Sequence, residues 1–206
     1  MMTREVPDRY VKYIPKIISG ETYEFTFEED YTPFKDASEY STVINACGRN
    51  NNYELGMDVI KGHRAQRHVE LEALVKEHKQ YLAQSLTKIQ ENNSVEIMDN
   101  IQYFNGDDVK ASVVGTIAGM LLNNYDWQKP IVGYTHIDSD TPGYKVSLRC
   151  SRLLGYDGVH YGNLVRDISQ KCGGSGGGHS VACGAYIPED NIDQFLELLN
   201  NSVNFN

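Results

Sequence analysis

A glycine-rich run near the C-terminal end carries the residue types best suited to chemistry in this chain. Residues 173–184 read GGSGGGHSVACG, with five glycines ahead of a single histidine. Glycine permits positive φ angles and close backbone approach, so successive N–H groups can converge on an anion, and His179 would add a directional donor. We therefore predict a phosphate or nucleotide cradle at Gly176, Gly177, Gly178 and His179. A flexible linker is the alternative, but the run lies between a helical pattern and a strand-like segment, 181–187.

Positive charge gathers around this run although the whole chain carries a net charge of −9. Between Tyr144 and His179 the cations outnumber the carboxylates by three: Lys145, Arg149, Arg152, Arg166 and Lys171 against Asp157 and Asp167. The acidic total argues against a surface generally coated by nucleic acid. A local positive groove, however, suits the binding of a few phosphates. Chance clustering of surface charge is the alternative, and the glycine run in the same stretch favours the groove.

Two arginines near the run are candidates for neutralising phosphates. Arg149 and Arg152 are three residues apart, so they fall on opposite faces of a strand unless the strand ends between them. Arg149 is the favoured one of the pair, and a surface ion pair is the alternative for each. His160, beside Tyr161, is better explained as a structural hydrogen-bonding residue than as a ligand contact.

No metal and no catalytic residue is predicted for this chain. The alternation of His136, Asp138 and Asp140 could place three hard-cation ligands on one strand face. Residues 138–143 are better explained as a hairpin turn, since they are rich in Asp, Ser, Pro and Gly. The four cysteines form no CxxC pair and are expected to be buried thiols.

The elements that position these residues follow from hydrophobic periodicity. The N-terminal part predicts a short strand at 23–28 and helices at 36–47, 54–61 and 64–92; an Asp36/Glu39 capping box opens the first helix and Gly48 ends it. Strands are then expected at 95–98, 101–104, 131–136, 144–150 and 181–187, and helices at 112–123, at 163–171 and from Pro188 onward. The predicted fold class is α/β (α+β). A helical segment with a long bridging helix, 1–92, precedes a compact domain, 93–206, with a mixed β-sheet flanked by helices.

The composition limits which class of protein this can be. The chain has 206 residues, of which 40% are hydrophobic and 23% charged, as in ordinary globular proteins. No apolar run approaches the ~20 residues of a membrane span, and the polar start lacks a signal-peptide pattern. A soluble, cytoplasmic protein without a membrane partner is expected.

Several of these segments resemble RecJ-like phosphoesterases. Residues 176–184, GGGHSVACG, are similar to the GGGHxxAAG signature of the domain that follows the catalytic DHH domain, with Cys183 in place of an alanine. Residues 146–152, VSLRCSR, resemble that domain's serine-and-arginine strand, and residues 162–164 resemble the turn into its next helix. Residues 37–49 resemble the segment between the two domains of archaeal RecJ-like nucleases. The resemblance covers about residues 33–200.

The resemblance implies that this is the nucleic-acid-binding C-terminal part of a single-strand-specific exonuclease, a hydrolase of DNA replication and repair. Ser147 would then join Arg149, Arg152 and the GGGH residues in holding substrate phosphates. The family's manganese or magnesium is held by a DHH domain, whose motif is absent here, so the chain alone is expected to be inactive. The implied partners are single-stranded DNA or RNA, a DHH domain in cis or in trans, and the GINS complex.

Two other functions remain open at this point. The first is a non-catalytic replication scaffold that binds GINS. The second is the substrate domain of a phosphoesterase for short oligonucleotides or cyclic dinucleotides, or the tRNA-holding domain of alanyl-tRNA synthetase-like proteins, which share the GGGH signature. The segment 45–49, NACGR, favours the RecJ-like interpretations over this second group.

Overall fold

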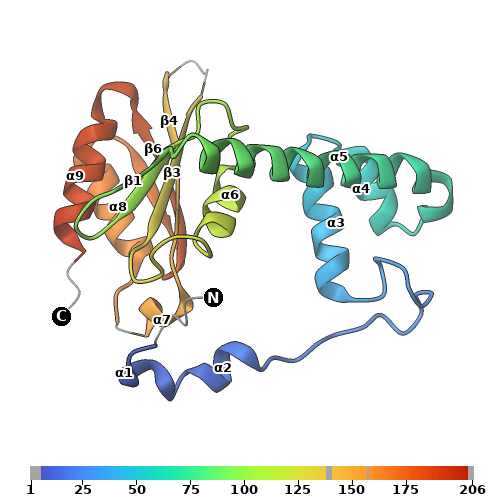
Figure 1. Ribbon diagram of the computed structural model, residues 1–206. Helices are drawn as coiled ribbons and strands as arrows, with labels where there is room; N and C mark the ends of the chain where they lie inside the picture. The colour runs from blue at the N-terminus through green and yellow to red at the C-terminus, as the bar shows by residue number, and fades with distance from the viewer. Residues whose placement is uncertain (1–5, 138–140, 157, 204–206) are drawn as a thin grey trace. The chain divides into compact units, whose positions relative to one another are not determined.

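The computed structural model describes residues 6–137, 141–156 and 158–203, and these form two compact units (Figure 1). Unit 1 comprises the residues up to Tyr13 and those from Ser85 onward, and unit 2 comprises Ile14–Gln84. Within the described ranges, no helix is both long enough and apolar enough to cross a membrane.

Unit 2 is helical. It contains α2 (Ile14–Ile18), α3 (Ala37–Arg49), α4 (Tyr53–Ile60) and the first part of α5 (Arg64–Glu91). The Asp36 carboxylate accepts hydrogen bonds from the N–H groups of Ser38 and Glu39, at 2.8 and 2.9 Å, which confirms Asp36 as the N-cap of α3. The helices bury a small apolar core: Phe34, Val43, Cys47, Leu55, Val59 and Leu71.

Two details of the prediction for this unit are wrong. Residues 23–28 form no strand; within the described chain Glu24 makes one isolated bridge to Asp36. Phe25 packs its ring against Tyr40 instead, with centroids 5.5 Å apart, so the alternating pattern reflects local aromatic packing. Gly48 does not end α3, because the helix continues to Arg49 and Asn50 takes the C-cap position.

Unit 1 contains a six-stranded mixed sheet in the order β1-β2-β3-β4-β6-β5, which confirms the predicted fold class. The strands are β1 (Val95–Ile97), β2 (Gln102–Asn105), β3 (Ile131–Ile137), β4 (Gly143–Arg149), β5 (Ser175–Gly178) and β6 (Ala182–Pro188). Only β2 and β3 pair in parallel, across the connection through α6 (Val114–Leu121). The other helices are α1 (Asp8–Val11), α7 (Arg152–Gly155), α8 (Tyr161–Lys171), the 3₁₀ turn η1 (Glu189–Asn191) and α9 (Ile192–Ser202).

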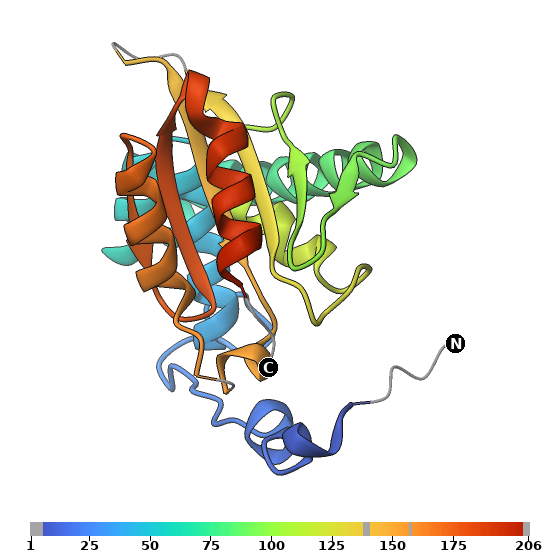
Figure 2. The same cartoon turned by 90° about the vertical axis from the view of Figure 1, so that its left-hand side faces the viewer.

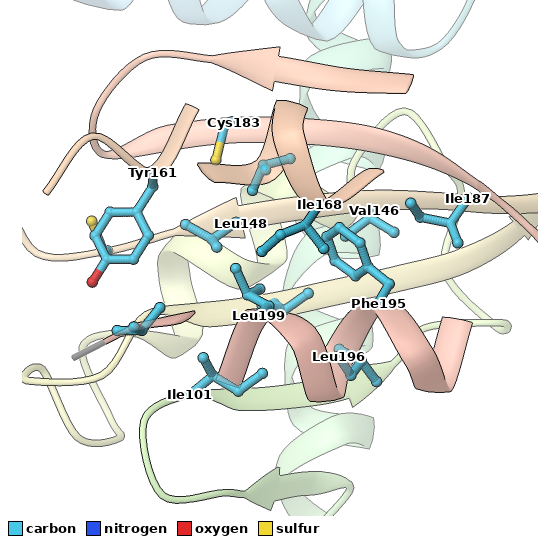
Figure 3. Packing of buried hydrophobic residues seen from close by; sticks show 14 of the residues in the cluster. Ile101, Val146, Leu148, Tyr161, Ile168, Cys183, Ile187, Phe195, Leu196 and Leu199 are labelled. Atoms are coloured by element: carbon cyan, nitrogen blue, oxygen red, sulfur yellow. The ribbon is translucent and has the colours of Figure 1, made fainter. Parts of the chain in front are cut away.

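Helices cover both faces of this sheet. The helix α6 packs on β3 and β4 on one face, and α8 and α9 lie on the other face (Figure 2). On the α8/α9 side, Val146, Leu148, Ile187 and Phe195 are buried in one apolar core with Leu199 (Figure 3). Each such side chain contributes about 1.5–3 kcal/mol of transfer free energy. Because Val146 and Leu148 face the α8/α9 side, strand alternation points Ser147 and Arg149 to the α6 side.

Candidate functional site

The predicted cradle is an edge strand rather than a loop. Residues Ser175–Gly178 form β5, which pairs antiparallel with β6 in the register Gly176↔Ala185, Gly177↔Gly184 and Gly178↔Cys183. The strand does not follow from the sequence pattern, because glycine is disfavoured in strands.

Close packing explains why β5 consists of glycines. A Cβ on Gly176 would lie 2.8 Å from the Cβ of Ala185 and 2.9 Å from the Ser169 hydroxyl of α8. A Cβ on Gly178 would lie 2.7 Å from the Cα of Cys183, and the φ angle of Gly178 is 138°. Gly177 has open space around it but a φ of 151°. The strand thus brings its backbone closer to β6 and α8 than any other residue type permits.

The predicted site residues fall in rows across three strands. Ser147 of β4 lies opposite Gly184, and Gly184 lies opposite Gly177. In the next row Arg149 lies opposite Ala182, whose carbonyl accepts a hydrogen bond of 2.9 Å from the N–H of His179. Two interstrand spacings make each row about 10 Å wide.

These rows define a surface that we call the glycine face. Its residues are Lys145, Ser147, Arg149, Gly177, His179, Ala182 and Gly184. Alternation places them on the α6 side of the sheet, and α8 packs against β5 and β6 from the opposite side. His179 is exposed, whereas Gly177, Ala182 and Gly184 are partly exposed. The structure thus brings six predicted or quoted residues together with Lys145, which was counted among the local cations but not predicted as a site residue; its alternation with Ser147 and Arg149 could have revealed it.

The Arg149 side chain is held against the sheet. Its Nη1 donates to the carbonyl of Leu148 at 2.8 Å and reaches that of Cys183 at 3.4 Å. Its Nη2 lies over α6, where a Cβ on Gly115 would be 2.6 Å away. Such a Cβ would also lie 3.1 Å from the hydroxyl of Ser147, which is 6% exposed. Gly115 therefore provides the space in which Arg149 lies beside Ser147.

The first turn of α8 fixes the end of β5. A Cβ on Gly162 would overlap the carbonyl of Gly178, and the Tyr161 N–H donates to the Ser180 carbonyl at 3.2 Å. His160 is the N-cap of α8, and its Nδ1 accepts from the Asn163 N–H at 3.2 Å. This contact agrees with the structural interpretation of His160. The positive end of the α8 dipole thus lies beside the glycine strand.

Other predicted residues lie elsewhere. The strand β4 ends at Arg149, and the exposed Arg152 begins α7. Arg166 forms an ion pair with Asp167 on α8, at 3.5 Å, so the five local cations do not converge on one groove. Asp138 and Asp140 lie outside the described residues, whereas the His136 ring packs against Tyr144. No group of three His, Cys, Asp or Glu side chains within the described ranges has the geometry of a metal site.

The cysteines are all buried and unbridged, as predicted. Burial raises the pKa of the Cys150 thiol to about 12, with a further contribution from Cys183. Burial also raises the pKa of Cys183 to about 12, and the neighbouring Arg149 opposes the rise. Neither thiol is therefore a nucleophile at neutral pH.

Sequence comparison decides the family, because residues 97–204 match the DHHA1 domain. The chain belongs to the DHHA1 domain family. An uncharacterized protein of Methanocaldococcus jannaschii is 31% identical over 172 residues, which are 82% of this chain and 35% of that protein. The chain thus spans about a third of the length of this curated relative.

Solved structures share the fold of this DHHA1 protein. RecJ from Thermus thermophilus in complex with Mg²⁺ matches 81% of this chain and 25% of its own, with a TM-score of 0.60 and 15% identity. CDC45 from Entamoeba histolytica matches 87% of this chain and 39% of its own, with a TM-score of 0.56 and 11% identity. A pGpG-specific phosphodiesterase, PggH from Vibrio cholerae, matches 98% of this chain and 69% of its own, with a TM-score of 0.50 and 16% identity.

Proposed function

We propose that this chain holds single-stranded nucleic acid on its glycine face, as the substrate-binding part of a DHH-family exonuclease. The observation that carries the proposal is the pair of rows, Ser147–Gly184–Gly177 and Arg149–Ala182–His179. They combine an edge strand that is glycine at 176–178, one guanidinium and one imidazole.

Each component suits a phosphodiester backbone. Edge strands present N–H groups that lack a neighbouring strand, and glycine lets a phosphate approach them closely. The Arg149 guanidinium, oriented by its bonds to two carbonyls, can donate to phosphate oxygens. His179 adds a donor at the exposed end of the row. The glycine face would fix the position of the nucleic-acid strand without recognising its base sequence.

The chemical step belongs to a DHH domain outside this chain. Manganese or magnesium bound in such a domain would activate the attacking water. The glycine face contributes by orientation, which can supply several kcal/mol of a barrier. Cleavage by this chain alone would contradict this division of roles.

The decisive experiment is binding of labelled single-stranded DNA and RNA to the full chain, by fluorescence anisotropy at several salt concentrations. Arg149→Gln removes a charged hydrogen-bond donor, so we expect affinity to fall about tenfold to a hundredfold. The slope of log affinity against log salt should shrink by about 0.7 for each lost phosphate contact. Arg166→Gln is the matched control, because Arg166 lies on α8 and already pairs with Asp167. Equal losses for both variants would contradict the proposal.

The same assay separates the alternative functions. Displacement of the long strand by a low concentration of a dinucleotide would favour a short-oligonucleotide phosphoesterase. Capture of purified GINS without measurable affinity for single strands would favour a replication scaffold. Metal-dependent cleavage that appears only when a RecJ-like DHH domain is added would support the exonuclease.

A further inference from the structure

The other side of the same sheet carries a connected group of aromatic rings. Tyr103 of β2, Tyr134 of β3 and Tyr144 of β4 follow one another with ring centroids 6.4 and 5.3 Å apart, and His136 continues the row at 5.6 Å from Tyr144. The three tyrosines pack against the core on the α8/α9 side. All four rings are partly exposed. We call these four residues the tyrosine face. Figure 2 shows β1 and β2 to the side of α9.

Carboxylates from three elements and one turn surround these rings. Glu96 of β1 accepts a hydrogen bond of 2.6 Å from the Tyr103 hydroxyl. Glu189 of η1 lies 3.5 Å from the His136 Nε2, and Asp107 accepts from the His136 backbone N–H at 2.9 Å. Asp193, in the first turn of α9, is the fourth.

The tyrosine hydroxyls respond to these charges. The hydrogen bond to Glu96, together with burial, raises the pKa of Tyr103 to about 12. Burial, Tyr144 and the carboxylates of Asp107 and Asp193 raise the pKa of Tyr134 to about 12. The pKa of Tyr144 is raised by burial and by Asp107, Glu189 and Asp193. The tyrosine side chains therefore stay neutral and form an apolar surface with carboxylates around it.

We propose that the tyrosine face binds an arginine-rich segment of a protein partner. A guanidinium stacks on an aromatic ring while its fork of N–H groups reaches a carboxylate, and this surface offers both contacts within one side-chain length. Arginine fits better than lysine because only its flat, weakly hydrated cation can do both at once.

Aromatic rings on a sheet are also typical of surfaces that stack the bases of RNA. The charge argues against that use here, since Glu96, Glu189 and Asp193 are exposed and would repel phosphates. The glycine face, in contrast, carries Lys145 and Arg149. Charge complementarity thus assigns a basic polypeptide to the tyrosine face.

The test uses the full chain and a fluorescein-labelled peptide of alternating arginine and serine, followed by anisotropy. Peptides with lysine or glutamate in place of arginine are the ligand controls. We expect binding in the order arginine, lysine, glutamate. The double variant Glu189→Gln/Asp193→Asn should weaken the arginine peptide about tenfold, and Tyr144→Leu about fivefold. Asp167→Asn, which removes one exposed carboxylate from α8 where the double variant removes two, should alter it less than twofold.

Three outcomes would overturn the proposal. One is an effect of Asp167→Asn that equals the effect of the double variant per charge removed, which would mean nonspecific attraction to an acidic protein. Another is a Tyr144→Leu variant that melts at the same temperature as the wild type and binds the arginine peptide just as tightly. The third is a loss of single-strand affinity in Tyr144→Leu, which would assign the rings to nucleic acid.

Discussion

One strand, β4, supplies both faces of the sheet with opposite chemistry. Its residues Lys145, Ser147 and Arg149 point to the glycine face, whereas Tyr144 starts the alternate set that continues into the core with Val146. The glycine face offers backbone and positive charge, and it depends on the absence of side chains at residues 176–178 of β5. The tyrosine face offers rings and negative charge from side chains alone.

This difference predicts that the two faces respond to different changes. Added atoms should damage the glycine face, because its backbone lies within contact distance of β6 and α8. Removed charges or rings should damage the tyrosine face. Because the two faces lie on opposite sides of the sheet, we expect a nucleic acid and a basic polypeptide to bind without competing.

The largest effect is expected from Gly162→Ala. The new methyl group would overlap the carbonyl of Gly178, and since both are backbone-fixed, α8 or β5 must shift. We expect the free energy of unfolding of unit 1 to fall by about 1–3 kcal/mol and single-strand affinity to fall with it. Trp127, the one tryptophan in the chain, belongs to unit 1, so its fluorescence in urea measures this change. Gly119→Ala is the matched control, because its methyl would make only an ordinary contact at 3.9 Å from the Arg149 Cγ. An unfolding curve that superimposes on that of the control would show that α8 need not lie so close.

The second prediction concerns Gly115→Ala, which should move Arg149 without harming the fold. The methyl would meet the Arg149 Nη2 at 2.6 Å, and the far end of a flexible side chain can move away. Alanine in a helix gains about 0.5–1 kcal/mol over glycine, so stability should not fall. We expect a loss of single-strand affinity of about five- to tenfold and unchanged binding of the arginine peptide. Gly119→Ala again serves as the control, and equal affinities for the two variants would mean that the position of Arg149 is unimportant.

Local signals predicted much of unit 1. The apolar spacing of Ile192, Phe195 and Leu199 in α9 and the five predicted strands are all present. These elements could be predicted because hydrophobic periodicity and local packing agree. Pro188 itself ends β6, and an intervening 3₁₀ turn delays α9 to Ile192.

Features that depend on strand register could not be predicted from the sequence. A run of glycines has no strand propensity, so only its close fit against β6 and α8 makes β5 a strand. The residues of the tyrosine face lie on three strands, and only the pairing of those strands brings the rings together. The alternation of β4 puts Ser147 and Arg149 on one face, but nothing in the sequence indicated that Gly115 makes room for the guanidinium.

The third prediction sharpens the tyrosine face through its titration. The hydrogen bond to Glu96 is the main cause of the raised pKa of Tyr103, so Glu96→Gln should lower that pKa from about 12 toward its ordinary value near 10. A tyrosine with a raised folded pKa contributes stability that is present below pH 10 and is lost as the pH rises from about 10 to 12, because the unfolded chain releases the proton first. The variant should therefore lose less stability than the wild type in this window. The chain has 14 tyrosines, so the change is measured as the difference between the near-ultraviolet tyrosinate titrations of the variant and the wild type, and Asp167→Asn should leave the titration unchanged.

The smallest effect is expected at His160, and it tests whether the imidazole supports the glycine face only through α8. His160→Ala removes the acceptor for the Asn163 N–H and should cost about 0.5–1 kcal/mol of unit 1 stability, measured by Trp127 fluorescence in urea. His160→Asn supplies another capping oxygen and should restore most of it. Both variants should bind single strands as the wild type does, because the ring is engaged with the helix. A loss of affinity in both variants, with stability restored in the asparagine variant, would instead place His160 among the residues that touch the ligand.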